Sequence, residues 1–257
     1  MSYDDLGTPH HPTGAVDRIV SLVPSLTETV AVAAPGRLVG ATDWCTHPAG
    51  LDVTRVGGTK WPDLDRIRAL DPGFVLANAE ENRPQDLDAL RAAGIRVWVT
   101  APATVPDALD SLERMLEAMG IPEQAWIGTA RQVWSAAPDP RLAGRTVAVP
   151  IWRRPWMVVG RDTFAGDVLR RLGLTNLYAD HADRYPKIPI ERIRADHPDL
   201  VVLPDEPYAF SASDGPSEFG SVPSALVSGR HLTWYGPSLV EARAVLVDQL
   251  TRPVRSL

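Results

Sequence analysis

Short apolar runs alternate with segments of helical spacing over the first hundred residues. The runs are rich in Val, Ile and Leu, which is typical of buried strands. Between them apolar positions recur every three or four residues, as at Leu87, Leu90 and Ala93, and this spacing predicts helices. Strands are predicted at 18–24, 37–42, 74–77 and 95–100. The order β-α-β-α-β-α-β with short links predicts a parallel sheet covered by helices.

The pattern changes after residue 104, where helical spacing continues to about Trp134 with an interruption at Gly120 and Pro122. A Pro/Gly-rich joint follows, and alternation of strands and helices then resumes. The stretch 63–78, DLDRIRALDPGFVLAN, is similar to 189–204, PIERIRADHPDLVVLP. This internal echo predicts two similar α/β lobes.

The predicted fold class is therefore α/β, with two Rossmann-like lobes that have central, mostly parallel sheets and are joined by a long helix. In such an architecture a ligand cleft is expected between the lobes, at the carboxyl ends of the strands. The predicted parts are a flexible N-terminal arm (1–16), an N-terminal lobe (17–103), a linking helical segment (104–137) and a C-terminal lobe (138–257).

Composition and charge argue against several classes of function. The 257 residues carry a net charge of −6, which argues against a nucleic-acid binder. A single cysteine excludes an intrachain disulfide. The first residues have no apolar core of a secretory signal, and no run of about 18 apolar residues would span a membrane. The chain as written is expected to be cytoplasmic, or extracytoplasmic if a leader has been removed.

Polar side chains follow the apolar strand that ends near Ala77. Asn82 is the expected N-cap of a helix that begins near Pro84. Asn78, Glu80 and Glu81 precede this cap, where the strand opens onto the predicted cleft. They are interpreted as the acidic lip of a ligand pocket, or as including an ion-pair latch between the lobes.

Other loops after strands offer further candidates in the first half. Ser25 is a predicted N-cap, with Glu28 at the spacing of a capping box. Its helix start could bind an anion or be a plain cap. Asp43 and Trp44 follow the second strand. Lys60 and Trp61 follow two glycines, and the indole is either an exposed stacking platform or a cover for the next helix.

Cys45 and His47 lie two residues apart, and a cysteine and a histidine at this spacing could bind a soft metal. Two ligands alone make a poor site, and a free cysteine is usually buried in the core. No metal site is therefore predicted.

The segment from Trp152 to Trp156 is the richest in the second half. Trp152, Arg153, Arg154 and Trp156 could stack on a ligand and bond to its carboxylates, amides or phosphate; alternatively the arginines face solvent. If the chain stays extended, Trp152 and Arg154 share one face. Additional possible walls are Tyr185, His231, Trp234 and Tyr235.

Several segments together resemble a known family. RIVSLVPSLTETVAVA, GGTKWPDLDRIRALDPGFVLA, GRDTFAGDVLRRLGLTNLY and KIPIERIRADHPDLVVL look like the helical-backbone (type III) solute-binding proteins of ABC importers, nearest to the cobalamin-binding branch. The resemblance covers about Arg18 to Leu250. It implies two lobes bridged by a helix, a cobalamin or other metal chelate as ligand, an ABC permease as partner if the chain is exported, and a monomer.

The main functional prediction is binding of a corrinoid, tetrapyrrole or metal-chelate molecule. The alternative is a cytosolic enzyme of small-molecule or natural-product metabolism that reuses the solute-binding fold, with Glu/Lys acid–base chemistry in the cleft. An intracellular sensor that reports ligand occupancy is a third interpretation.

Overall fold

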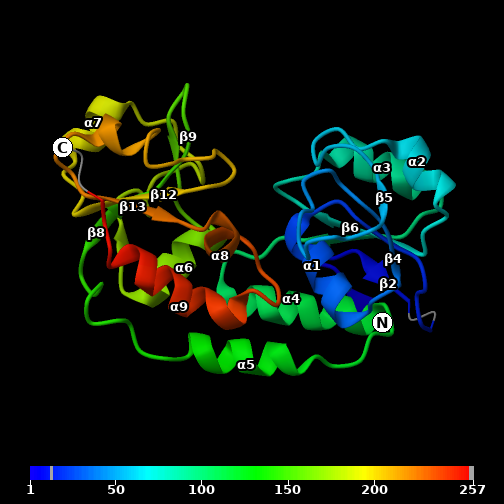
Figure 1. The fold of residues 1–257 in the computed structure, drawn as a ribbon. Helices are drawn as coiled ribbons and strands as arrows, with labels where there is room; N and C mark the ends of the chain where they lie inside the picture. Colours follow the sequence, from blue (N-terminus) through cyan, green and yellow to red (C-terminus); the bar gives the residue numbers. More distant parts are fainter. Residues whose placement is uncertain (12–13, 255–257) are drawn as a thin grey trace. The chain divides into compact units, whose positions relative to one another are not determined.

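A computed structural model of the chain describes residues 1–11 and 14–254. The chain divides into two compact units (Figure 1). Unit 1 is formed by Met1–Pro102, Pro106–Gly128 and Tyr235–Pro237, and unit 2 by the other described residues. Each unit has its own parallel sheet with helices on it, which confirms the predicted α/β class with two lobes. The ligand cleft stays a prediction.

Unit 1 is built on a five-stranded sheet in the order β5-β4-β3-β6-β7, and all neighbouring strands are parallel. The strands are β3 (Ile19–Ser21), β4 (Leu38–Ala41), β5 (Thr54–Arg55), β6 (Phe74–Asn78) and β7 (Val97–Thr100). Every residue of β6 is buried, as expected for a strand covered on both faces. Because the strands are parallel, their carboxyl ends lie along one edge of the sheet.

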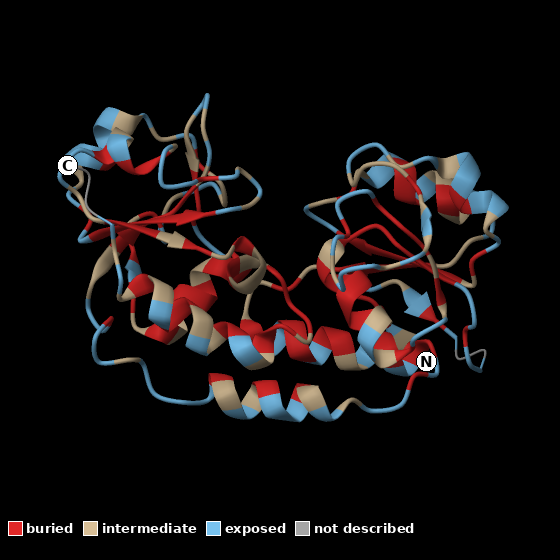
Figure 2. Cartoon of the chain, in the orientation of Figure 1, coloured by how far each residue is buried: buried red, intermediate tan, exposed pale blue. Residues whose placement is uncertain are grey.

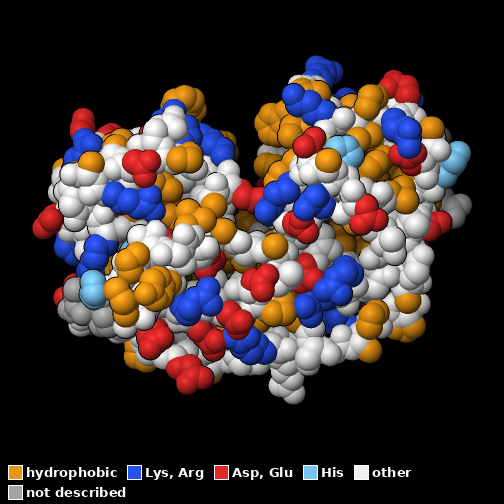
Figure 3. All heavy atoms as spheres, turned by 180° about the vertical axis from the view of Figure 1, so that it is seen from behind, with side chains coloured by type: hydrophobic (Ala, Val, Ile, Leu, Met, Phe, Trp, Pro, Cys, Tyr) orange, Lys and Arg blue, Asp and Glu red, His pale blue; other side chains and the backbone are white. Residues whose placement is uncertain are grey.

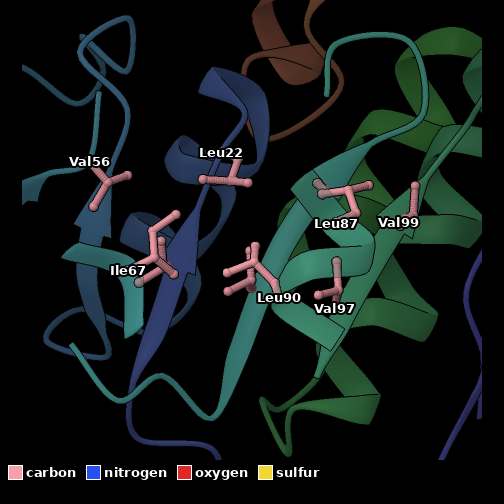
Figure 4. Packing of buried hydrophobic residues seen from close by; sticks show 10 residues of the cluster. Leu22, Val56, Ile67, Leu87, Leu90, Val97 and Val99 are labelled. Carbon is pink, nitrogen blue, oxygen red and sulfur yellow. The ribbon is translucent and has the colours of Figure 1, made fainter. Parts of the chain in front are cut away.

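Helices cover both faces of this sheet: α1 (Pro24–Ala33) lies on one, and α2 (Leu64–Ala69) and α3 (Pro84–Ala92) lie together on the other (Figure 1). Asp63 caps α2 by accepting a hydrogen bond from the Arg66 amide at 2.9 Å. The core under α2 and α3 (Figure 4) includes Leu22, Val56, Ile67, Leu87, Leu90, Val97 and Val99. Truncating a fully buried leucine such as Leu90 to alanine costs about 2–5 kcal/mol.

The N-terminal residues differ from the predicted flexible arm. β1 (Ser2–Tyr3) and β2 (Pro9–His10) form an antiparallel hairpin in unit 1. The Asp4 carboxylate accepts a hydrogen bond from the Val99 amide at 3.2 Å, and the His10 ring packs on Trp98. Local composition predicted looseness, but the hairpin is held by side chains that lie far away in sequence. Residues 12–13 of the predicted arm lie outside the described residues.

The predicted linking segment consists of two helices, α4 (Val105–Ala118) and α5 (Ala125–Trp134). They are separated where Gly120 adopts a left-handed backbone (φ 64°). The chain crosses from unit 1 to unit 2 inside α5, between Gly128 and Thr129, after an earlier short stretch, Ala103–Val105, that also belongs to unit 2. In unit 1, the Asp5 carboxylate anchors α4 by accepting hydrogen bonds from Ser111 and Arg114, each at 2.7 Å.

Unit 2 has a four-stranded parallel sheet in the order β11-β8-β12-β13. The strands are β8 (Thr146–Ala148), β11 (Thr175–Asn176), β12 (Leu200–Pro204) and β13 (Ser224–Val227). The helices are α6 (Phe164–Leu172), α7 (Ile190–Ala195), α8 (Gly229–Thr233) and α9 (Leu239–Leu250), with a 3-10 turn, η1 (Pro216–Phe219). The inner strands β3, β6 and β12 are buried at every residue (Figure 2).

An antiparallel hairpin, β9 (Pro150–Trp152) and β10 (Met157–Val158), follows β8 and carries the Trp/Arg-rich segment. Acidic and basic side chains are interspersed over the visible face of each unit (Figure 3). Within the described part of the chain, no helix has the length and apolar character needed to cross a membrane.

Candidate functional site

Three loops meet at the carboxyl edge of the unit 1 sheet, and they carry most of the candidate residues of the first half. Residues 42–47 follow β4, residues 57–63 precede α2, and residues 79–83 follow β6. Three hydrogen bonds join the loops. They run from the Asp43 amide to the Gly57 carbonyl (2.9 Å), from the Asn82 side chain to the Thr59 carbonyl (3.0 Å), and from the Lys60 ammonium to the Glu80 carbonyl (2.6 Å).

Two tryptophans stand out of these loops. Trp61 is 72% exposed and Trp44 is 68% exposed, so Trp61 does not cover the next helix. The Arg83 guanidinium lies 3.6 Å from the centre of the Trp61 ring, and the Asp86 carboxylate holds it with two hydrogen bonds of 2.7 Å. The Trp44 indole nitrogen lies against Gly58, 3.8 Å from where a Cβ would be. The two large ring surfaces are thus held on loops tied to each other.

Two acidic residues lie on the same group of loops as Trp44 and Trp61. Glu80 is exposed and Glu81 is half-buried, both directly after β6. The Lys60 ammonium donates one hydrogen bond to the backbone carbonyl oxygen of Glu80. The choice between an acidic lip and a latch between lobes stays a prediction.

Asn78 is buried, and its side-chain amide forms hydrogen bonds within the protein. Its oxygen accepts from the amides of Glu80 (2.8 Å) and Glu81 (3.2 Å), and its nitrogen donates to the Tyr235 hydroxyl (2.7 Å). Asn82 does not cap α3: its side chain accepts from the Asn78 amide at 2.9 Å. The N-cap prediction is therefore wrong, although α3 does begin with Pro84 as predicted.

Ser25 is also not an N-cap. α1 begins at Pro24, and its cap residue, Val23, makes no side-chain cap bond. Ser25 and Glu28 both lie inside the helix, so the predicted capping box is wrong. Since Ser25 is only 2% exposed, its hydroxyl is not at the surface where the tryptophans lie.

Cys45 and His47 point to different partners. The buried Cys45 thiol lies 3.0 Å from the Thr27 hydroxyl and 3.1 Å from that of Thr42, and burial raises the pKa of the thiol. His47 lies beside the Thr46 hydroxyl at 3.1 Å. The thiol therefore belongs to the core of unit 1.

In unit 2, aromatic rings gather beneath the β9–β10 hairpin. Trp156 stacks on Phe210 with ring centres 6.0 Å apart and meets Phe219 edge-on at 5.4 Å. Trp152 is 44% exposed and packs edge-on against Tyr208 at 5.8 Å. Trp156 is thus largely a packing residue, whereas Trp152 presents part of its ring to the outside.

The two arginines of the hairpin behave differently from each other. Arg153 is ion-paired with Asp214 and, at 2.7 Å, with Glu218. Arg154 is exposed and has a left-handed backbone (φ 67°), so the chain does not stay extended. The condition for Trp152 and Arg154 to share a face is therefore not met.

Tyr185 is half-buried, and its neighbours Arg184 and Pro186 accept backbone hydrogen bonds from Gly160 and from Val158 of β10. Trp234 is 7% exposed at the end of α8. It hydrogen-bonds Glu206, whose pKa is raised to about 7, first by burial and then by the neighbouring charge of Asp205.

Glu206 and the roles of Arg83 and Tyr235 were not predicted from the sequence. A signal for Glu206 was present, because the internal echo that aligns Asn78 with Pro204 also aligns Glu80 with Glu206. No comparable signal marks Arg83 or the structural partners of Tyr235, since both depend on which loops meet.

Comparisons with known proteins agree with this architecture. The model of a periplasmic binding protein family matches residues 133–223. A vitamin B12-binding protein of Yersinia pseudotuberculosis is 25% identical over 203 residues, which cover 75% of this chain and 71% of that protein. Its Yersinia pestis counterpart is 24% identical with the same coverage.

Solved structures extend the fold similarity over most of the chain. The periplasmic vitamin B12-binding protein BtuF of Vibrio cholerae has a TM-score of 0.73 and 19% identity, over 91% of this chain and 96% of that one. The periplasmic heme-binding protein RhuT of a Roseiflexus species has a TM-score of 0.78 and 21% identity, over 93% and 98%. The predicted resemblance to the helical-backbone solute-binding proteins is thereby confirmed, whereas nothing in the comparisons supports the enzyme alternative.

Proposed function

We propose that this chain, which resembles the helical-backbone solute-binding proteins in sequence and fold, binds a large, flat, ring-containing small molecule. The ligand classes are those of the sequence-based prediction: a corrinoid, a tetrapyrrole or another metal chelate. The observation that carries the proposal is the pair of exposed indoles, Trp44 and Trp61, held on cross-linked loops at the carboxyl edge of a parallel sheet. Ligands of open α/β sheets bind at this edge.

The geometry of Trp61 favours a flat partner. Arg83 covers one face of its ring, and the ring is nevertheless mostly exposed, so the surface left for a ligand is the other face and the edges. An indole buries a large apolar area without much loss of rotamer freedom, which makes tryptophan a frequent hot spot of binding. The names of the relatives, which mention vitamin B12 and heme, agree in the kind of ligand.

Asp43, Lys60, Glu80 and Glu81 complete the proposed site in unit 1, since they lie on the same three loops. Trp152, Arg154, Tyr185 and Trp234 of unit 2 remain proposed ligand residues on the basis of sequence. An ABC permease is the partner that the resemblance implies, and its role belongs to the proposal.

Tryptophan fluorescence and native mass spectrometry test the proposal. Freshly purified protein is examined for a bound small molecule and then titrated with cyanocobalamin, hemin and a ferric siderophore. Trp44→Ala and Trp61→Ala should each weaken binding of whichever ligand binds by about 10- to 100-fold, which corresponds to about 1.4–2.8 kcal/mol. Their melting temperatures should stay near that of the wild type, since both side chains are exposed.

Tyr3→Ala is the matched control, because Tyr3 is an aromatic residue of unit 1 that is 50% exposed but lies on the N-terminal hairpin. Its affinity should equal that of the wild type. If none of the three ligands binds, or if the tryptophan variants bind as tightly as the control, the proposed function is wrong.

A further inference from the structure

Tyr235 reaches the carboxyl ends of β6 and β7 from 157 residues further along the chain than Asn78. It is 4% exposed, and its hydroxyl lies 2.7 Å from the Asn78 amide nitrogen and 2.8 Å from the Thr100 hydroxyl. Asn78 and Thr100 end these neighbouring strands. The phenol therefore bridges two strand ends at the edge where the candidate site lies.

The hydrogens of this bridge can be assigned. The Thr100 hydroxyl donates to the Ala77 carbonyl at 3.1 Å, so its oxygen is left to accept from the Tyr235 hydroxyl. The phenol oxygen in turn accepts from the Asn78 amide nitrogen. This order gives the Thr100 and Tyr235 hydroxyls one acceptor each and leaves the Asn78 oxygen turned away from Tyr235.

The Asn78 oxygen faces the loop after β6. It accepts from the amides of Glu80 and Glu81, while the Asn78 backbone amide donates to the Asn82 side chain. The Asn82 amide continues to the Thr59 carbonyl, one residue before Lys60 and two before Trp61. Hydrogen bonds of Asn78 and Asn82 thus connect the Tyr235 phenol with residues 79–82 and with the loop that carries Lys60 and Trp61.

We propose that Tyr235 is a positioning residue for the ligand-binding loops of unit 1. Its hydroxyl fixes the orientation of the Asn78 amide, and that amide holds residues 79–82 in the conformation that supports the loop of Trp61. Without the hydroxyl, the buried amide nitrogen has lost its acceptor, and rotation of the amide would remove the acceptor of the Glu80 and Glu81 amides. The role in ligand binding rests on the proposed function, whereas the role in holding the loop does not.

Close packing supports the placement of the phenol. A Cβ on the next residue, Gly236, would lie 2.9 Å from the Thr29 hydroxyl and 3.2 Å from the Ser25 carbonyl. Only glycine lets this segment approach α1 so closely. The backbone that carries Tyr235 is therefore fixed independently of its hydroxyl, so that Tyr235→Phe should keep the ring in place.

Hydrogen–deuterium exchange of the full chain tests the proposal without any ligand. In Tyr235→Phe, the amides of Glu80 and Glu81 should exchange about tenfold faster than in the wild type, as expected when a local hydrogen bond is weakened. Tyr178→Phe is the matched control, because this buried tyrosine of unit 2 donates to Asp196 at 2.9 Å. It should leave the Glu80 and Glu81 amides unchanged.

Affinity gives the second measurement. For the ligand that the wild type binds, Tyr235→Phe should weaken binding about tenfold while Tyr178→Phe does not, even where both lower the melting temperature. Unchanged exchange and affinity in Tyr235→Phe would overturn the inference.

If Tyr235→Phe fails to fold, Thr100→Val replaces it. Loss of the phenol's acceptor should also speed exchange at Glu80 and Glu81, and normal exchange there overturns the inference. If the wild type binds no ligand, the proposed function fails, and exchange alone decides the role of Tyr235.

Discussion

Glu206 lies two residues after β12, an inner strand of the unit 2 sheet, in surroundings that favour its protonated form. Burial is the main cause and the Asp205 charge adds to it, while the Trp234 hydrogen bond and the Arg230 charge act in the opposite direction. The pKa is raised from 4.5 to about 7, so the folded state holds a proton that the unfolded chain has released over this interval. This contribution to stability is present in full below pH 4.5 and is lost as pH rises through about 7.

Glu206→Gln should therefore flatten the pH dependence of stability. In the wild type, the free energy of unfolding should fall by roughly 2 kcal/mol from Glu206 alone between about pH 5 and 7.5, and the variant should lack this fall. Urea unfolding at several pH values measures it. Glu241→Gln is the control. His231 and Arg230 lower the pKa of Glu241, so the contribution of this carboxylate to stability is lost only at acidic pH, below the ordinary pKa of a glutamate. An equal slope in Glu206→Gln and the wild type would contradict the prediction.

At the scale of elements, α8 depends on a glycine at its first residue. A Cβ on Gly229 would lie 2.2 Å from the Glu206 Cγ and 2.9 Å from the Glu206 backbone nitrogen and oxygen. The Asp205 carboxylate also accepts a hydrogen bond from the Gly229 amide at 2.7 Å. The start of α8 is therefore packed directly on the end of β12.

Gly229→Ala should destabilise the protein by about 1–3 kcal/mol, as expected for overpacking against backbone. Gly128→Ala is the matched control: this glycine lies inside α5 with open space where a Cβ would be, so alanine should stabilise by up to about 1 kcal/mol. Chemical denaturation of both variants checks the opposite signs. Similar changes in the two would mean that the contact with Glu206 is easily relieved.

Sequence was sufficient for elements whose cause is local. The apolar run at Phe74 and the proline at Pro84 correctly predicted β6 and the start of α3. Capping was less predictable: Ser25 and Asn82 are good caps in isolation, but Ser25 lies inside α1 and the Asn82 side chain is bonded to Asn78 and Thr59. Trp44 and Trp61 were candidates because they lie on loops after strands, and exposure was one of two interpretations of Trp61, whereas Arg83 over Trp61 follows from the meeting of two loops that no local pattern encodes.

At the scale of the whole molecule, the chain does not divide into two consecutive halves. Tyr235–Pro237 belongs to unit 1, although the residues on both sides of it belong to unit 2. The repeat of 63–78 at 189–204 predicted two lobes, but it gave no sign of this return. The partners of Tyr235 were unpredictable for that reason.

The protein is predicted to be a monomer. The resemblance implies this state, and a net charge of −6 opposes close approach of two copies. Size-exclusion chromatography with light scattering should give a mass near 28.0 kDa at low and physiological salt. A mass twice as large, independent of dilution, would show the prediction to be wrong.

Cys45 has a practical consequence for following unfolding. It is the only cysteine of the chain, and its thiol is fully buried between Thr27 and Thr42. A thiol-reactive dye can modify it only when unit 1 opens around it, and each molecule can take one label. The rate of modification under native conditions therefore reports the free energy of that opening. The modification rate of Cys45 can therefore be used, without an engineered probe, to compare how ligands and substitutions change the local opening of unit 1.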